Sequence, residues 1–219
     1  MPTPSDFAFV ATGTAGIVLA AGGGKRFGGP KALAISPDGT PWLVNAVRSL
    51  LGGGCAPVIV VLGSAADEAE ALLSKAFAVA GGDDGANREV RVVRSADWQT
   101  GMAASLRAGL LAANEIDPRP VAVAVVTVDV PSLSSAMVRR LVAPAPGPTP
   151  VEPATLRQAS FSGAPGHPVV IGRAHWGALV EQLHGDTGAR RYLRAHGATV
   201  VDCSDLGSGM DIDVDDRTP

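Results

Sequence analysis

The residues whose types and spacing suit chemistry gather in one short stretch near the start of the chain. Three consecutive glycines, residues 22–24, follow a run of small apolar residues, and the cations Lys25, Arg26 and Lys31 come next. Glycines let a ligand approach the backbone, whose N–H groups bind anions, and flanking cations add charge-assisted hydrogen bonds. Open α/β sheets bind their ligands at such a turn, at the carboxyl end of a buried strand. The stretch therefore predicts a triphosphate-binding loop.

Two better-known phosphate-binding loops do not fit this spacing. The dinucleotide pattern G-x-G-x-x-G places Phe27 where its third glycine belongs, and the P-loop pattern requires Ser or Thr after its lysine. Here Lys25 is followed by Arg26, and Lys31 by Ala32. The alternative that stays open is an ordinary strand-to-helix turn with a solvated basic face.

Carboxylates at two distant points of the chain stand where an unpaired negative charge would be costly. Asp129 directly follows residues 121–128, the most hydrophobic strand expected in the chain, and a carboxylate buried there is costly unless it pairs with a cation or a metal. A helix N-cap is the other reading of Asp129, but Ser132 suits that role better. Asp211 and Asp213 alternate, so an extended backbone would turn both toward one face. A cation would offset their repulsion; otherwise this end of the chain is an exposed acidic tail.

The basic loop resembles a known signature. Residues 19–31 are similar to the L-A-A-G-x-S-x-R-M-G-x-x-K motif of the MobA-like nucleotidyltransferases, whose loop wraps a triphosphate with its arginine and lysine on phosphate oxygens. Gly24 stands where serine is usual and Phe27 where methionine is usual, and neither change removes a charge. The resemblance implies catalytic roles for Arg26 and Lys31. The nucleotide-binding residues that it implies in this loop are Leu19, Ala20, Ala21, Gly22, Gly23, Gly24 and Lys31.

Three later segments resemble elements of the same family, most closely its molybdenum-cofactor cytidylyltransferase branch, and they occur in the family's order. Residues 98–110 are similar to an element that helps to bind base and ribose, which implicates Gly101 and Ser105, although close helix packing would also explain their small side chains. Residues 129–131 match the D-M/V-P element, whose aspartate holds Mg²⁺. Residues 209–216 resemble a D-I-D-T-P-E-D ending whose first aspartate approaches the metal. The resemblance therefore implies a catalytic Asp129 and the metal ligands Asp129 and Asp211.

Two further segments resemble the acceptor side of that family. Residues 163–169 are similar to its G-x-x-G-H-P-V element, and residues 185–190 to G-D-x-G-A-R, which lies near the pterin-bearing acceptor. The implied acceptor-binding residues are His167, Asp186, Gly188 and Arg190. From the residues alone, a lone histidine is more often structural. The second segment is equally well explained by a surface helix with Asp186 as its N-cap.

The resemblance implies a Mg²⁺-dependent nucleotidyltransferase. Such an enzyme would move a nucleoside monophosphate, CMP from CTP in the most similar branch, onto a phosphorylated acceptor such as molybdopterin, and release pyrophosphate. A molybdoenzyme or its chaperone is an implied partner. Two alternatives stay open: an NAD(P)H-dependent oxidoreductase of the nicotine blue oxidoreductase type on the same fold, and a non-catalytic chaperone that binds molybdenum cofactor.

The elements that must position these residues alternate between buried strands and helices. Hydrophobic periodicity predicts strands at residues 15–21, 57–62, 89–94, 121–128 and 154–161. It predicts helices at residues 41–51, 65–80 and 133–141. It also predicts one helix that follows the loop at residues 97–101 and another that begins within residues 185–190. The resemblance implies an α/β chain with the three-layer, Rossmann-like nucleotidyltransferase fold and a mostly parallel central sheet. We expect one domain, residues 15–219, after a flexible tail at residues 1–14.

Composition argues against several other classes of protein. With 46% hydrophobic and 18% charged residues, the 219-residue chain is typical of a folded domain, and its net charge of −3 gives no reason to expect nucleic-acid binding. Cys55 and Cys203 lack the spacing of a zinc site or a disulfide framework. No apolar run is long enough to span a bilayer, and the first residues do not resemble a signal peptide. We therefore expect a cytoplasmic protein that binds no membrane.

Overall fold

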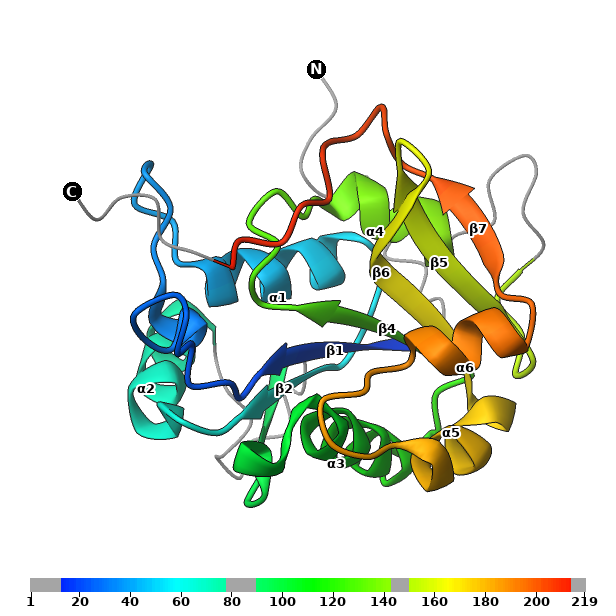
Figure 1. Ribbon diagram of the computed structural model, residues 1–219, viewed down its shortest axis with the longest axis horizontal. Coiled ribbons are helices and arrows are strands. Elements are labelled where there is room, and N and C mark those ends of the chain that lie inside the picture. Colours follow the sequence, from blue (N-terminus) through cyan, green and yellow to red (C-terminus); the bar gives the residue numbers. More distant parts are fainter. Residues whose placement is uncertain (1–12, 78–89, 143–149, 214–219) are drawn as a thin grey trace.

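A central sheet organises the molecule (Figure 1). Within residues 13–77, 90–142 and 150–213, which the computed structural model describes, it has seven strands in the order β3-β2-β1-β4-β6-β5-β7. Its parallel half comprises β3 (Val90–Arg94), β2 (Val58–Leu62), β1 (Thr14–Ala20) and β4 (Ala122–Thr127). Its other half comprises β6 (Ala164–Gly172), antiparallel to β4 and β5, then β5 (Leu156–Phe161) and β7 (Thr199–Asp202), which are parallel to each other. The expected mostly parallel sheet is confirmed.

Helices cover both faces of the sheet and give the three layers that were expected (Figure 1). One apolar core lies under α1 (Trp42–Gly52), α2 (Ala66–Ala76) and α4 (Ser135–Val142). The other lies under α3 (Met102–Asn114), α5 (Trp176–Gln182) and α6 (Arg190–Ala195). Because side chains alternate along β1, Ile17 enters the second core and Val18 the first, which explains why this strand is apolar throughout. None of the helices described is long and apolar enough to cross a membrane.

The helix caps differ from those expected. At the start of α4, the Ser134 hydroxyl accepts a hydrogen bond from the Met137 amide at 3.3 Å, so Ser134 rather than Ser132 caps this helix. Helix α6 begins at Arg190 with Ala189 at its N-cap and no side-chain cap, so Asp186 is not the cap that the sequence suggested. Asp186 stands three positions before Ala189, in the preceding turn.

The edges of the expected elements also shift. Strand β1 already begins at Thr14, whose carbonyl accepts the Ala56 amide at 3.0 Å, so the expected tail over residues 1–14 is too long by at least this residue. Residues 1–12 lie outside the described part of the chain, as do 78–89, where helix 65–80 was expected to end. Helix α5 and strand β7 were not predicted, because both are short and β7 exposes most of its side chains.

The strand order brings two distant turns together. From β1 the chain continues to β2 on one side of the sheet, while β4 pairs with β1 on the other side, and Leu19 lies opposite Thr127. The carboxyl ends of β1 and β4 are therefore neighbours at a reversal of strand order, where open α/β sheets bind ligands. The glycine-rich loop leaves one of these ends and Asp129 follows the other.

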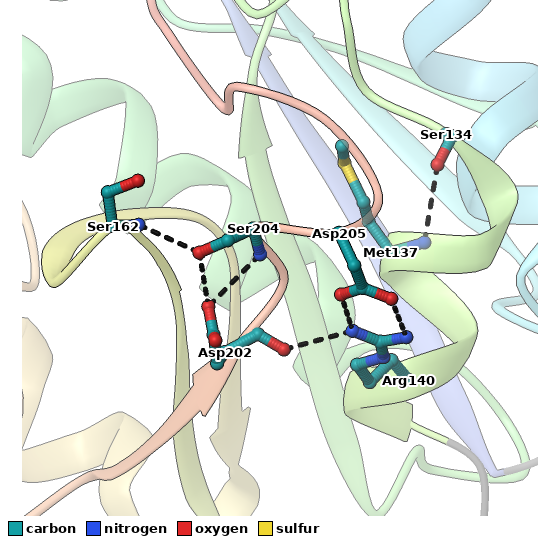
Figure 2. A network of polar contacts seen from close by, with 7 residues as sticks. All are labelled: Ser134, Met137, Arg140, Ser162, Asp202, Ser204 and Asp205. Carbon is teal, nitrogen blue, oxygen red and sulfur yellow. Dashed lines mark hydrogen bonds and ion pairs between the residues drawn. The ribbon is translucent and has the colours of Figure 1, made fainter.

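After β7, residues 203–213, here called the C-terminal segment, return along α4 toward β4. Figure 2 shows how this segment begins: the Arg140 guanidinium of α4 donates hydrogen bonds to both carboxylate oxygens of Asp205 and to the Asp202 carbonyl, the last at 3.0 Å. The Ser204 hydroxyl donates to the Asp202 carboxylate and accepts the Ser162 amide at 2.8 Å. These contacts join the segment to α4 and to the β5–β6 turn.

Candidate functional site

The glycine-rich loop after β1 is folded back on itself. The Gly24 carbonyl accepts the backbone amides of Phe27 at 3.0 Å, Gly28 at 3.0 Å and Gly29 at 3.2 Å. Gly24 has a φ of +59°, and a Cβ there would lie 1.7 Å from the Gly29 carbonyl oxygen. This turn therefore requires glycine, and the serine found at this position of the similar motif could not replace it without opening the turn.

Two cations of the loop share two carboxylates. The Lys31 ammonium lies 2.9 Å from Asp129 Oδ2 and 3.0 Å from Asp213 Oδ1, and Arg26 Nη2 lies 3.2 Å from Asp213 Oδ2. The Lys31 side chain is only 14% exposed, whereas the Arg26 side chain is 77% exposed. The structure thus connects the loop, the end of β4 and the C-terminal segment through one ion-pair cluster.

Burial and ion pairing act in opposite directions on Lys31. Burial alone would lower the pKa of Lys31, but its hydrogen bonds to Asp129 and Asp213 and the charges of both carboxylates together outweigh that effect, so its pKa lies above the ordinary value. The hydrogen bond from Lys31 and its charge hold the pKa of Asp213 below the ordinary value. At neutral pH this cluster therefore presents a cation at the base of the loop.

The other oxygen of Asp129 indicates a place for a cation. Asp129 Oδ1 is buried and has no hydrogen-bond partner among the described residues, which is costly for a carboxylate. Asp211 lines the same cavity as Asp129. Such a pair fits a hard divalent cation, which prefers one or two carboxylates together with phosphate oxygens and water. Across the described parts of the chain, no three His, Cys, Asp or Glu side chains form a complete metal site, so the ligand would supply the remaining oxygens.

Two cavities meet at Asp129. The larger, with a volume of about 810 Å³, is lined by the glycine-rich loop, Lys31, Trp98 and the start of α3. It brings together every residue predicted to bind nucleotide: Leu19, Ala20, Ala21, Gly22, Gly23, Gly24, Lys31, Gly101 and Ser105. The smaller cavity, of about 320 Å³, is mostly apolar and is lined by three of the predicted acceptor residues, His167, Gly188 and Arg190. The arrangement can hold two ligands on opposite sides of one carboxylate.

Three aspartates are placed differently from the expectation. Asp186, grouped with the acceptor residues in the sequence, lines the larger cavity, and its Oδ1 would lie 2.7 Å from a Cβ built on Gly101. Asp211 and Asp213 were expected on one face of an extended segment. Instead, Asp211 lines the smaller cavity and Asp213 the larger one, because residues 208–213 form no regular strand.

His167 of β6 lines the smaller cavity. Its Nδ1 lies 3.2 Å from the Val125 carbonyl, and because a carbonyl only accepts, Nδ1 carries the proton. Burial lowers the pKa of His167, more than the Val125 hydrogen bond and the charges of Asp129 and Asp211 raise it. The imidazole is therefore neutral at pH 7, and Nε2 is a hydrogen-bond acceptor.

Trp98 and Asp213 line the larger cavity, although neither was among the site residues named from the sequence. A Cβ on Gly63 would lie 2.6 Å from Trp98 Cγ, and one on Gly23 would lie 3.4 Å from Trp98 Cζ3, so the indole packs against both glycines. The glycines that end β1 and β2 were the available signal for this packing. For Asp213 the sequence offered only its place in an acidic run, because its partners are 182 residues away for Lys31 and further for Arg26.

Known proteins resemble this chain over most of its length. Residues 16–200 match the family model described as MobA-like NTP transferase domain. Nicotine blue oxidoreductase from Paenarthrobacter nicotinovorans is 35% identical over 209 residues, which cover 90% of this chain and 91% of that protein. The crystal structure of Rv0371c from Mycobacterium tuberculosis is 27% identical, with a TM-score of 0.67 over 93% of this chain and 94% of that one, and the same protein has been crystallised in complex with manganese. A nucleotidyl transferase from Methanothermobacter shares the fold, with 22% identity and a TM-score of 0.69 over 92% of each chain.

Proposed function

Because the chain belongs to the MobA-like NTP transferase family, we propose that it transfers CMP from CTP to a phosphorylated acceptor such as molybdopterin and releases pyrophosphate. The observation that carries this proposal is the contact between Lys31 and Asp129 where the two cavities meet. Asp129 borders both cavities and its Oδ1 has no hydrogen-bond partner among the described residues, while Lys31 lines the larger cavity beside it.

In the proposed reaction, a phosphate oxygen of the acceptor attacks the α-phosphorus of the nucleotide. A phosphorus–oxygen bond forms while the bond from the α-phosphorus to the oxygen bridging to the β-phosphate breaks, and pyrophosphate leaves with that electron pair. The chain needs no covalent nucleophile, because positioning and charge neutralisation do most of the catalytic work. In this mechanism Lys31 and Arg26 neutralise the β- and γ-phosphates and the leaving pyrophosphate.

Asp129 and Asp211 are the residues that would hold a divalent metal, Mg²⁺ in the proposal. When bound, the ion supplies charge neutralisation for the phosphate oxygens. The carboxylate Oδ1 of Asp129 supports this assignment, since it is buried and lacks a partner among the described residues. The manganese complex of the Mycobacterium relative supports a divalent ion in this family and leaves the choice between Mg²⁺ and Mn²⁺ to experiment.

The smaller cavity is the proposed acceptor site. Its apolar walls suit the body of a heterocyclic acceptor, and Arg190 offers a positive charge to an anionic group. His167 Nε2 would accept a hydrogen bond from an N–H or O–H group of that acceptor. We propose that Gly188 also contacts the acceptor. Its lack of a side chain leaves room beside Met102, because a Cβ there would lie 3.1 Å from the Met102 sulfur.

Pyrophosphate release tests the proposal directly. It should be measured with each of the four common nucleoside triphosphates, with Mg²⁺ or Mn²⁺, and with and without molybdopterin. We expect release that requires metal and molybdopterin and is fastest with CTP. Binding of molybdenum cofactor without release from any nucleotide would instead favour a carrier role.

Reduction of a dye by NAD(P)H is a second candidate function, favoured by the 35% identity to a protein named nicotine blue oxidoreductase. The pyrophosphate of a nicotinamide dinucleotide could occupy the same glycine-rich loop, and a flat dye the smaller cavity. Hydride transfer does not require a metal-binding carboxylate. NADPH oxidation with a quinonoid dye as acceptor should therefore be followed in parallel, and metal-independent oxidation without pyrophosphate release would favour this second function.

A further inference from the structure

The two cations of the glycine-rich loop already hold an anion that belongs to the chain itself. One oxygen of the Asp213 carboxylate lies 3.0 Å from Lys31 Nζ and the other lies 3.2 Å from Arg26 Nη2. A single anionic group thus bridges both cations with separate oxygens, as a phosphate group does when two cations bind it. The larger cavity is lined by all three of these residues, so the bridge lies inside the proposed nucleotide site.

The backbone before Asp213 is held at defined points. The Ile212 amide donates to the Asp129 carbonyl at 2.9 Å, directly beside the carboxylate that Lys31 binds. Gly209 lies against the Phe161 ring, where a Cβ would be 2.0 Å from the ring carbon Cε2. At its start the segment is fixed by Arg140 and Asp205 (Figure 2). The position of Asp213 therefore follows from the packing of the C-terminal segment.

A phosphate ligand must compete with this carboxylate. Lys31 is mostly buried, and two of its three ammonium donors already serve Asp129 and Asp213. Because Asp213 also pairs with Arg26, a phosphate group that bridges Lys31 and Arg26 must take the place of one of these carboxylates. Asp129 is 20% exposed and lies at the end of β4, whereas Asp213 is 43% exposed in a segment without regular structure. Asp213 is the partner that can move at lower cost.

We propose that Asp213 is an intramolecular mimic of a phosphate group, which fills the anion subsite between Arg26 and Lys31 and is displaced, together with Ile212, when a pyrophosphate-bearing ligand binds, while Asp211 keeps its place beside Asp129. The inference rests on the proposed function only in requiring that the loop binds phosphates. It makes the C-terminal segment an autoinhibitory contact that lowers affinity for free phosphate compounds. The ligand could be a nucleoside triphosphate, a dinucleotide or pyrophosphate itself.

Titration calorimetry with inorganic pyrophosphate, without divalent metal, tests the proposal. Compared with the unmodified chain, Asp213→Asn should bind pyrophosphate about three- to tenfold more tightly, the scale of two partly exposed ion pairs. Asp38→Asn is the matched control: Asp38 is exposed, its Oδ1 accepts the Thr40 amide, and asparagine keeps that acceptor while removing the same charge. Equal or weaker binding by Asp213→Asn, a gain that Asp38→Asn reproduces, or no binding by any of the three proteins would overturn the proposal.

Hydrogen exchange of the unmodified chain gives a second readout that does not depend on a variant folding. Pyrophosphate should accelerate exchange in peptides that contain the Ile212 amide, because displacement of Asp213 releases its hydrogen bond to Asp129. Unchanged or slower exchange there, at saturating pyrophosphate, would contradict displacement. Neither readout involves nucleotidyl transfer. An enzyme that releases no pyrophosphate from any nucleotide could therefore still confirm the displacement, and an active enzyme could still refute it.

Discussion

Lys31 and Asp129 are 98 residues apart in the chain, and their ammonium and carboxylate groups meet at 2.9 Å. Each follows the carboxyl end of one of two neighbouring parallel strands, β1 and β4. The contact joins the phosphate-binding loop to the expected metal ligand, and a carboxylate oxygen of Asp129 stays without a partner in the described structure. Four predictions follow from this site and its surroundings.

Replacing Lys31 should remove most of the activity. Lys31→Ala deletes the buried cation of the loop, and we expect pyrophosphate release from CTP to slow by about a hundredfold or more, the scale for loss of one transition-state donor. Lys75→Ala is the matched control, because Lys75 is an exposed lysine of α2 that lines neither cavity. Steady-state rates for both variants, with thermal unfolding to verify folding, check this. Unchanged turnover in Lys31→Ala would contradict the assignment of the loop.

Asp129→Asn should weaken binding of a divalent ion. The substitution keeps the size of the side chain but removes the charge that a metal requires. We expect Mn²⁺ affinity, measured by electron paramagnetic resonance in the presence of pyrophosphate, to fall at least tenfold. Losing a residue that only hydrogen-bonds to a metal ligand already costs about tenfold or more, and Asp129 would itself be a ligand. Asp211→Asn should also lower it. Asp38→Asn, which removes an exposed carboxylate that lines neither cavity, is the control and should leave Mn²⁺ affinity unchanged; equal affinities in all variants would rule out the site.

Gly24→Ser should destabilise the chain even though serine is usual in the similar motif. The serine Cβ would collide with the Gly29 carbonyl oxygen, and the serine backbone would have to keep the φ of +59° that Gly24 has. We expect urea unfolding to show a loss of about 1–3 kcal/mol from this strain. Gly28→Ala separates the two causes, because Gly28 also has a positive φ but a Cβ there would meet nothing within 4 Å. An equal loss in both variants would mean that the contact with Gly29 does not matter.

The stability of the chain should depend on pH through His167. Its folded pKa is lowered by burial, so as the pH falls below the unfolded value of 6.5 the unfolded state takes up a proton before the folded state does. The free energy of unfolding should therefore decrease from pH 7.5 to pH 5. A histidine with a raised pKa in the folded state would instead make it increase over this range. His167→Asn keeps a donor for the Val125 carbonyl and cannot titrate, so its unfolding free energy should fall less steeply. Parallel pH profiles for the two proteins would contradict a neutral buried imidazole.

The fold was largely predictable from local patterns. The apolar runs at 15–21, 57–62 and 121–128 predicted buried strands, which the structure contains, and the resemblance to the MobA-like family implied their three-layer α/β arrangement. The loop was predictable because glycines and cations that are adjacent in the sequence stay adjacent in space. Strand β7 was missed, since it has four residues and becomes a strand only through pairing with β5. Four residues are too few for a hydrophobic pattern that would predict a strand.

In the candidate site, too, some features follow from local sequence and others only from tertiary packing. The amino-acid sequence by itself determined which residue types stand at the ends of β1 and β4, because a buried strand and the turn that follows it are specified within a few residues. Only the tertiary structure decided that Gly24 must be glycine, that Asp211 and Asp213 enter different cavities, and that Asp213 occupies the cations of the loop. These relationships depend on packing between segments more than a hundred residues apart or on the detailed path of a turn, and neither leaves a periodic pattern in the sequence.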